Sequence, residues 1–421
     1  MSYKQFYIGI IMIFLIIILT FTPVIGYVPF FRRKWIFLLL GITVLSNPFQ
    51  IKSEISSAFF YLAFSAIIMF LNVLSGDAYY AEKSKVFLEI AMLALVPMMT
   101  NYAIQEADKQ WFLKGCIITF FAILAIETVS TFYIDRQIPG AIRLLFKESL
   151  QSVNRNEVLY PFFKLGLSNY MLPHAMPMLI PPLVMGFKDR LNPMMLRIGS
   201  FVFLLLAMEL IWLSGAMAAF MMGIFFLILA VFTPFSEKPS LTFLIILGIL
   251  FFPFVIFDEL PQLVLKISQD IFSDNVYIYR KLLLLEENLY SEEATGDVAE
   301  RQNLYLISLN EFINNIFIGT NNALGNHSAF MDRLATLGLT GFVPYITYYY
   351  IQIKSFRRYI PDLNRIYFDE AIAAGLLMLL FKDTDSWEIY LTLFTVTPLL
   401  VIFLSRYRSV EEDESFIEIT E

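Results

Sequence analysis

The sequence predicts an all-α, polytopic membrane protein with about twelve transmembrane helices and two long external loops. Of its 421 residues, 58% are hydrophobic and 16% are charged, and the mean hydropathy is +0.67. A soluble domain is roughly 45–50% apolar and about 25% charged. Apolar windows of the roughly 17–25 residues that cross a hydrocarbon core recur along the whole chain. Residues 1–421 are therefore expected to form a single integral membrane domain.

Twelve apolar windows are assigned as spans. They lie at about 5–21, 35–51, 57–75, 86–103, 111–134, 170–187, 195–213, 214–233, 240–257, 334–352, 366–381 and 388–405. The formal net charge of −7 gives no reason to expect nucleic acid as a partner. The single cysteine, Cys116, excludes an internal disulfide. No His/Cys cluster suggests a metal site, and neither a metal nor another cofactor is expected.

Basic residues in short loops predict the orientation of the spans, because lysine and arginine accumulate on the cytoplasmic side. Three segments that the predicted spans place on the same side of the membrane carry basic residues. These residues are Lys188, Arg190, Lys354, Arg357, Arg358, Arg365, Arg406 and Arg408. We therefore place these loops and both termini in the cytoplasm, including the acidic tail 409–421. This topology places the cluster Arg32-Arg33-Lys34 on the external side of the membrane, against the usual cytoplasmic preference of basic residues.

The first external loop, residues 135–169, is basic. It carries five basic residues against three acidic ones, and the basic ones are Arg136, Arg143, Lys147, Arg155 and Lys164. Arginine matches phosphate oxygens with paired donors, so one interpretation is phosphate recognition. The alternative is contact with lipid headgroups, or pairing with acids of the other loop.

The second external loop, residues 258–333, carries twelve acidic and five basic residues. Apolar residues at Tyr305, Leu309, Phe312, Ile313 and Ile316 predict an amphipathic helix that Gly319 ends, and a second short helix is expected within 276–290. Asn303, Asn310 and Asn314 share another face of the first helix. Such side chains hydrogen-bond sugar hydroxyls in several directions. A solvated amphipathic cap is the competing interpretation.

Three carboxylates, Glu89, Glu127 and Glu209, lie within predicted spans, each towards the outer end. Ionisable groups at such depth usually face a cavity or a charged partner. Their shared level suggests a polar pocket that opens outwards. The alternative is that the carboxylates form ion pairs with the loop arginines. The two interpretations are compatible if the carboxylates position arginines that bind phosphate.

His327 is one of only two histidines and lies just before the span 334–352. Ser328 is expected to cap that helix. The positive helix end would keep the imidazole neutral and able to accept a proton. Asp332 lies about 140° further round the helix, so direct contact with His327 is not required. A structural histidine is the alternative, and that is the role assigned to His174 in its proline-rich stretch.

The segment 301–341 carries a recognisable motif. It runs Arg301-x-x-Leu-Tyr, Asn314-Asn315-x-x-x-Gly319, and Gly325-Asn326-His327-Ser328-x-x-x-Asp332-x-Leu-Ala-x-x-Gly338-Leu-x-Gly341. This pattern resembles the C-terminal half of the O-antigen and capsular polysaccharide polymerases of the Wzy type, which share their outline with the O-antigen ligases. Gly166-Leu-Ser-Asn-Tyr170, leading into a span, also looks like a motif of some of these polymerases.

The resemblance implies a GT-C-like, metal-independent membrane glycosyltransferase of lipopolysaccharide or capsule synthesis. It would act at the outer face of a bacterial cytoplasmic membrane and join oligosaccharide units carried on undecaprenyl pyrophosphate. A chain-length regulator protein would be a further partner. His327 would activate the acceptor hydroxyl. Arginines would hold the pyrophosphate, with Arg301 and Arg280 first and Arg143, Arg155 and Arg136 second. The expected substrate contacts also include Asn303, Asp332, Tyr170, Glu209, Glu127 and Glu89.

Two other functions stay open. A ligase of the same outline would transfer the glycan to another acceptor, and a flippase or transporter would show repeats and broken helices with ion sites at the midplane. The sequence also departs from the polymerase pattern at Trp212-Leu-Ser214-Gly215, where many members carry Ser-Arg. The phosphate clamp would then come largely from loop arginines.

Overall fold

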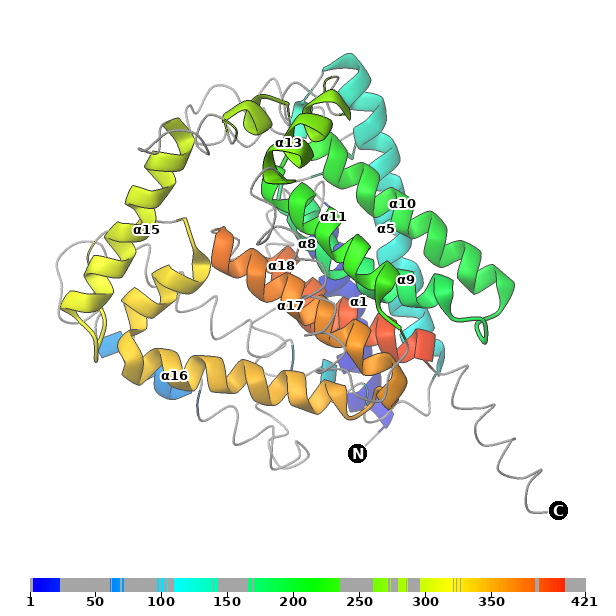
Figure 1. The fold of residues 1–421 in the computed structure, drawn as a ribbon. Helices are drawn as coiled ribbons and strands as arrows, with labels where there is room; N and C mark the ends of the chain where they lie inside the picture. The colour runs from blue at the N-terminus through cyan, green and yellow to red at the C-terminus, as the bar shows by residue number, and fades with distance from the viewer. Residues whose placement is uncertain are drawn as a thin grey trace. The chain divides into compact units, whose positions relative to one another are not determined.

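The computed structural model describes residues 3–22, parts of 61–71 and 97–104, 110–142 except 139, 166–234 except 169, parts of 260–286, 296–382 except 321, 323 and 326, and 386–405 (Figure 1). The chain divides into two compact units. The first comprises Met1–Ile123, Leu304–Ile360 and Leu379–Phe403, and the second comprises Leu124–Asn303, Pro361–Met378 and Leu404–Glu421.

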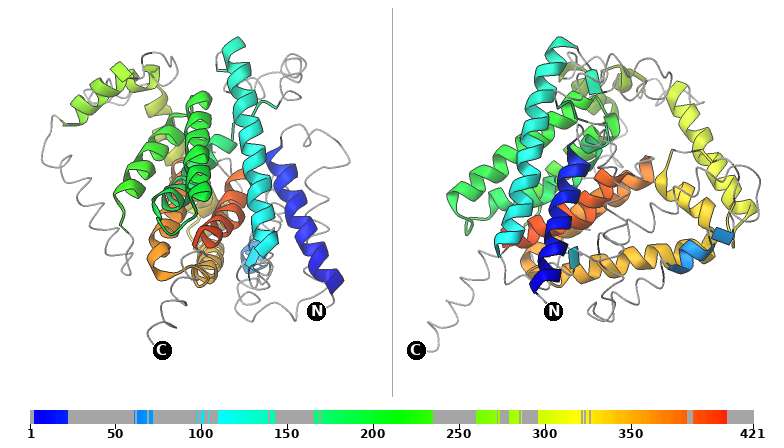
Figure 2. Two further views of the ribbon diagram at one scale, coloured as in Figure 1. Left: turned by 90° about the vertical axis from the view of Figure 1, so that its right-hand side faces the viewer. Right: turned by 180° about the vertical axis from the view of Figure 1, so that it is seen from behind.

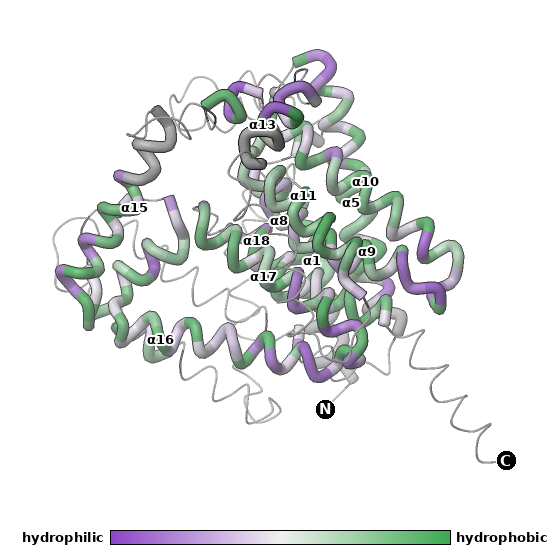
Figure 3. Tube along the Cα trace, in the orientation of Figure 1, coloured by the Kyte–Doolittle hydropathy of each residue, from purple (hydrophilic) through white to green (hydrophobic). Residues whose placement is uncertain are grey.

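Every regular element in the described part of the chain is helical, which confirms the predicted all-α architecture. Among the residues that the structure describes, three helices are long and apolar enough to cross a membrane: Lys114–Gln137, Met194–Ser214 and Glu388–Ser405. A shorter apolar helix covers Met217–Phe232, and the apolar stretches are green in Figure 3. Length and composition together support a helical membrane protein.

Five predicted spans coincide closely with single helices. They are α1 (Tyr3–Phe21), α5 (Gln110–Gln137), α10 (Met194–Ser214), α11 (Met217–Phe232) and α17 (Arg365–Phe381). The turn between α10 and α11 is made by Gly215, whose φ of 57° is left-handed, as glycine permits. The predicted spans 35–51 and 240–257 lie outside the described residues. A further helix, α13 (Leu260–Ile271), lies in the second predicted loop, where no helix was predicted at that position.

The predicted span 170–187 is not one continuous helix, which corrects that prediction. It is divided into α8 (Leu172–Ala175), a 3-10 turn (Met176–Met178) and α9 (Ile180–Lys188). Prolines at 173, 177, 181 and 182 explain the breaks, because proline lacks the amide that continues a helix. Within the second unit α9 is buried from Ile180 to Gly186 and packs against both α10 and α11 (Figure 2).

Lys188, at the end of α9, caps the C-terminus of α11. Its Nζ donates to three backbone oxygens, those of Ala230 (3.2 Å), Val231 (2.8 Å) and Thr233 (2.7 Å). The Thr233 hydroxyl donates to the Glu370 carboxylate of α17, and Tyr367 donates to the Thr233 carbonyl over 2.8 Å. Burial lowers the pKa of Lys188, and the charge of Glu370 opposes that shift. One polar cluster thus joins three helix ends.

Replacing Lys188 with methionine is expected to lower the free energy of unfolding by about 1–2 kcal/mol, because the last carbonyls of α11 lose a charged donor. Glu370→Gln is the partner variant. Combining both in a double-mutant cycle, measured by denaturation in detergent, should show a coupling of about 0.5–3 kcal/mol. Strict additivity of the two changes would contradict the cluster.

In the first unit, α16 (Ala329–Arg357) is broken at Gly338, which has φ 57° and ψ −177°. The amides just after the break bond to the preceding loop and not to their own helix. Leu339 N donates to Ile316 O over 2.7 Å, and Thr340 N donates to Phe317 O over 3.1 Å. The predicted span 334–352 therefore lies across a kink, and the bend is visible in Figure 1.

The glycines of the sequence motif are explained by close backbone approach at this kink. A Cβ on Gly338 would collide with Phe317 O, and a Cβ on Gly319 would collide with Thr336 O. Gly319 has a φ of 82° and donates its amide to Asn315 O over 2.9 Å. The preceding helix ends at Asn314, so the prediction that Gly319 ends it was late by one turn.

The core of the first unit is aromatic. The predicted span 388–405 forms α18 (Trp387–Leu391), a π-helical turn (Thr392–Val396) and a further helical stretch to Ser405. The Tyr349 ring of α16 stacks on Phe394 with centroids 4.9 Å apart. The Tyr345 and Tyr390 hydroxyls are 3.0 Å apart. Offset and edge contacts between such rings add stability beyond the area they bury.

Candidate functional site

The candidate site lies in the first unit, between α15 (Gly296–Asn314) and the start of α16. Tyr305, Ser308 and Glu311 follow one another at three-residue spacing, which puts them on one face of α15. Each contacts the segment 320–332, which leads into α16. This polar face was not predicted as a unit.

Ser308 joins α15 to the two halves of the motif. Its hydroxyl donates to Asp332 Oδ1 over 2.5 Å and accepts the Gly325 amide over 3.0 Å. Gly325 is required by space, because a Cβ there would collide with the backbone of Leu304. The motif positions 325 and 332 are therefore fixed by one buried serine, which is 1% exposed.

Glu311 holds the other end of the connecting loop. One of its carboxylate oxygens accepts from Thr320 Oγ1 over 3.0 Å and from Asn322 Nδ2 over 2.8 Å. The Thr320 amide in turn donates to Ala335 O of α16 over 2.9 Å. The loop is thus attached to α15 by side chains of a kind that binds sugar hydroxyls, and to α16 by its backbone.

His327 lies immediately before the N-terminus of α16. Ser328 is the N-cap, with extended backbone angles and a hydroxyl that accepts from Met331 N over 3.2 Å, which confirms the predicted cap. The half-buried imidazole meets the Tyr305 ring edge-on, with centroids 6.0 Å apart. Tyr305 is itself held by a 2.9 Å bond from its hydroxyl to Phe381 O.

Ser308→Ala is expected to lower the free energy of unfolding by about 1–3 kcal/mol, because it leaves the Gly325 amide and the Asp332 carboxylate without this partner. Thermal unfolding in detergent would measure the loss. Asn310→Ala is a matched control on an exposed turn of the same helix and should change stability by less than about 0.5 kcal/mol. Equal effects of the two variants would contradict the bridging role of Ser308.

The predicted phosphate-binding arginines are only partly visible. Arg301 lies in α15, but its side chain falls outside the described part. Arg280 is exposed on a helical stretch, 279–284, of the second unit, within the segment 276–290 predicted as helical. Arg143 and Arg155 lie outside the described residues. Arg136 is exposed and covers the Phe132 ring of its own helix, with the guanidinium carbon 4.4 Å from the centroid.

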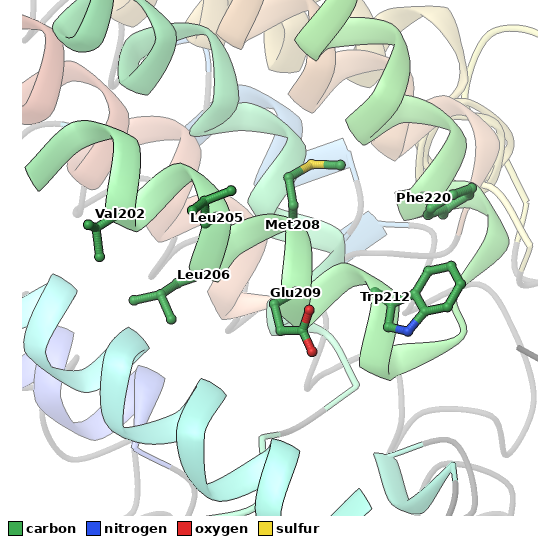
Figure 4. A pocket seen from close by; sticks show the side chains of 7 residues that line it. All are labelled: Val202, Leu205, Leu206, Met208, Glu209, Trp212 and Phe220. Carbon is green, nitrogen blue, oxygen red and sulfur yellow. The ribbon is translucent and has the colours of Figure 1, made fainter. Parts of the chain in front are cut away.

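The predicted carboxylates occupy different surroundings. Glu209 lines an open pocket of about 660 Å³ in the second unit. Figure 4 shows its carboxylate beside apolar side chains of α10 and Phe220 of α11. The Asp135 charge is near enough to act on Glu209. Glu127 is 2% exposed and is not among the lining residues of this pocket. Glu89 lies outside the described residues.

Three further predicted positions are now placed. Asn303 is exposed on α15, as the predicted separate face requires. Tyr170 lies in the second unit with its ring 4.7 Å from the His174 imidazole, between centroids. His174 is fully buried, and its Nδ1 lies 2.8 Å from Tyr170 O. Burial among prolines fits the structural role assigned to His174.

Arg333 is a buried charge that the sequence reasoning missed. It is 9% exposed and lies close enough to Tyr349 and Tyr390 to interact with them electrostatically. A buried guanidinium in such a core is costly unless it is well partnered. Its signal in the sequence was its position next to Asp332, at the start of a helix whose next charged residue is Lys354.

The chain matches no protein-family model and no curated protein. The resemblance to polysaccharide polymerases therefore depends on the sequence motif of residues 301–341.

Proposed function

We propose that this protein is a membrane glycosyltransferase that polymerises oligosaccharide repeat units carried on undecaprenyl pyrophosphate. The carrying observation is the segment from Gly325 to Asp332, which resembles the polymerase motif. It forms a Ser328-capped helix start with a half-buried imidazole against Tyr305. Carboxylates at 311 and 332 take part in two sets of hydrogen bonds between α15 and the segment 320–332. This combination suits proton transfer next to a polyhydroxylated substrate.

In this proposal twelve helices cross the cytoplasmic membrane of a bacterium, and the site faces outwards. Contacts inside the second unit agree with the proposed assignment of chain positions to the two sides of the membrane. Lys188 bonds to the end of α11, and Asn364 Nδ2 donates to Ser405 Oγ over 2.8 Å, so chain positions proposed as cytoplasmic lie together. In the first unit, Ala329 N donates to Lys382 O over 3.2 Å, which joins two positions proposed as external.

His327 would accept the proton of the acceptor hydroxyl as its oxygen attacks the anomeric carbon of the donor. The bond from that carbon to the pyrophosphate oxygen breaks, and its electron pair leaves with the pyrophosphate. The helix N-terminus favours the neutral imidazole that such a base requires. Tyr305 would hold the ring in place, and Asp332 would fix the start of the helix through Ser308.

The leaving pyrophosphate needs positive charge, which stabilises the negative charge developing on it. Arg301 and Arg280 are proposed for this task, with Arg143, Arg155 and Arg136 as second choices. Arginines in this role would make a metal unnecessary. The pocket beside Glu209 has apolar walls and one carboxylate. We therefore propose that it contacts the undecaprenyl carrier or a sugar hydroxyl of the substrate, and not the phosphate.

A glycan gel from cells that lack the gene tests this function against its alternatives. Single repeat units on the final acceptor would support a polymerase. Full-length polymer that stays on its lipid carrier would indicate a ligase instead. Repeat units trapped in the cytoplasm would indicate a flippase. Expression of the wild-type gene in the same cells is the control and should restore the normal ladder.

A further inference from the structure

Three apolar side chains at the end of α15 form an exposed patch, which we call the apolar turn. They are Ile313, Ile316 and Phe317, and they are 54%, 39% and 69% exposed. The sequence predicted Ile313 and Ile316 on the apolar face of an amphipathic helix, together with Tyr305. In the structure Tyr305 is half-buried, Ile313 is exposed near the end of α15, and Ile316 lies beyond that end.

The apolar turn is attached to α16 by its backbone. Ile316 O accepts from Leu339 N, and Phe317 O accepts both the amide and the hydroxyl of Thr340. The Asn315 amide donates to Phe312 O over 3.0 Å. A segment in contact with hydrocarbon must form its backbone hydrogen bonds within the protein, because lipid offers no replacement partner. These bonds therefore make the apolar turn compatible with such contact.

The apolar turn also continues an apolar surface of α16. Leu339 and Val343 are 39% and 56% exposed and lie four residues apart, on the face of the helix that begins where the turn is attached. No lysine, arginine, aspartate or glutamate lies between Glu311 and Asp332. A water-exposed loop rarely gathers bulky apolar side chains without any charge.

We propose that the apolar turn is a membrane anchor, with Ile313, Ile316 and Phe317 inserted among the acyl chains of the outer leaflet beside α16. The inference rests on the span assigned to α16 in the proposed function. It adds that the loop carrying His327, which Glu311 of α15 holds through Thr320, lies at the depth where the membrane surface begins. Acceptor hydroxyls on a lipid-linked substrate would then reach the site without the loop having to move towards the membrane.

Spin-label accessibility tests the anchor without any activity assay. Cys116 is the single cysteine and is 1% exposed, so Cys116→Ala gives a background for single labels. A nitroxide is attached in Phe317→Cys, in Val343→Cys as the control for lipid contact, and in Asn310→Cys as the control for water contact. Each protein is reconstituted in vesicles of phosphatidylethanolamine and phosphatidylglycerol. Collision with oxygen, which concentrates in lipid, is compared with collision with a water-soluble nickel chelate.

The label at 317 is expected to match the label at 343, with oxygen access severalfold above nickel access, and the label at 310 should show the reverse. A label at 317 that behaves like the one at 310, while 343 remains in lipid, would overturn the anchor and leave the α16 span standing. Low access to both reagents at 317 would mean burial against protein, which also overturns it. Nickel access at both 317 and 343 would overturn the span together with the anchor.

Discussion

His327→Ala is expected to reduce chain extension by about 10²–10⁴-fold, the usual contribution of a positioned general base. The imidazole lies just before a capped helix N-terminus and against Tyr305, so the change removes the proposed proton acceptor together with its edge-on contact to that ring. The measurement is the rate at which membranes carrying the variant lengthen a lipid-linked glycan. Added imidazole should restore part of that rate.

Two controls separate chemistry from folding in this test. Leu306→Ala changes an exposed side chain of α15 that has no proposed role in binding, and this variant should extend chains at the wild-type rate. The amount of His327→Ala protein in the membrane should equal that of wild type. Full-rate extension by His327→Ala would remove the histidine from the mechanism and leave the membrane fold untouched.

Gly338→Ala should destabilise the fold strongly, with a cost of about 3 kcal/mol or more. A φ of 57° with a ψ of −177° is a conformation that only glycine adopts readily, and strain of this kind costs about 1–3 kcal/mol. The added Cβ would also collide with Phe317 O. The kink of α16 and the loop attached to it should therefore be lost together, and thermal unfolding in detergent would measure the cost.

Gly199→Ala is the matched control for that change. Gly199 lies in the helical part of α10, and a Cβ there meets nothing within 4 Å. Alanine should stabilise the helix by about 0.5–1 kcal/mol, because glycine loses more conformational freedom on folding. If both glycine variants shift the unfolding temperature equally, the explanation of the kink is wrong.

Helices with long apolar windows were predictable because a span must be apolar over its whole length, whatever it packs against. The bounds of α1, α5, α10 and α11 follow from that rule. The Ser328 cap was predictable for a similar reason, because capping depends on residues within one turn. The break between α8 and α9 also had a local signal, because the segment contains several prolines. Those prolines were used only to interpret His174 as a structural residue.

The candidate site depended on contacts that no local pattern encodes. Ser308 joins Gly325 and Asp332 across 24 residues of chain, and it was one polar residue in a helix predicted from its apolar ones. Gly338 was visible as part of a motif, but its role came only from the carbonyl of Phe317 lying against it. Arg333 was passed over because one of its aromatic neighbours, Tyr390, comes from α18, far along the sequence.

The central claim is glycosyl transfer from one lipid-linked repeat unit to another. The most direct measurement uses the purified protein in vesicles that contain a single kind of undecaprenyl-pyrophosphate-linked repeat unit and no other protein. We expect a ladder of lengthening glycans on the carrier, with one free undecaprenyl pyrophosphate released for each added unit. The His327→Ala protein should give no ladder. Repeat units that remain single, or glycan that appears only on an acceptor without pyrophosphate, would contradict it.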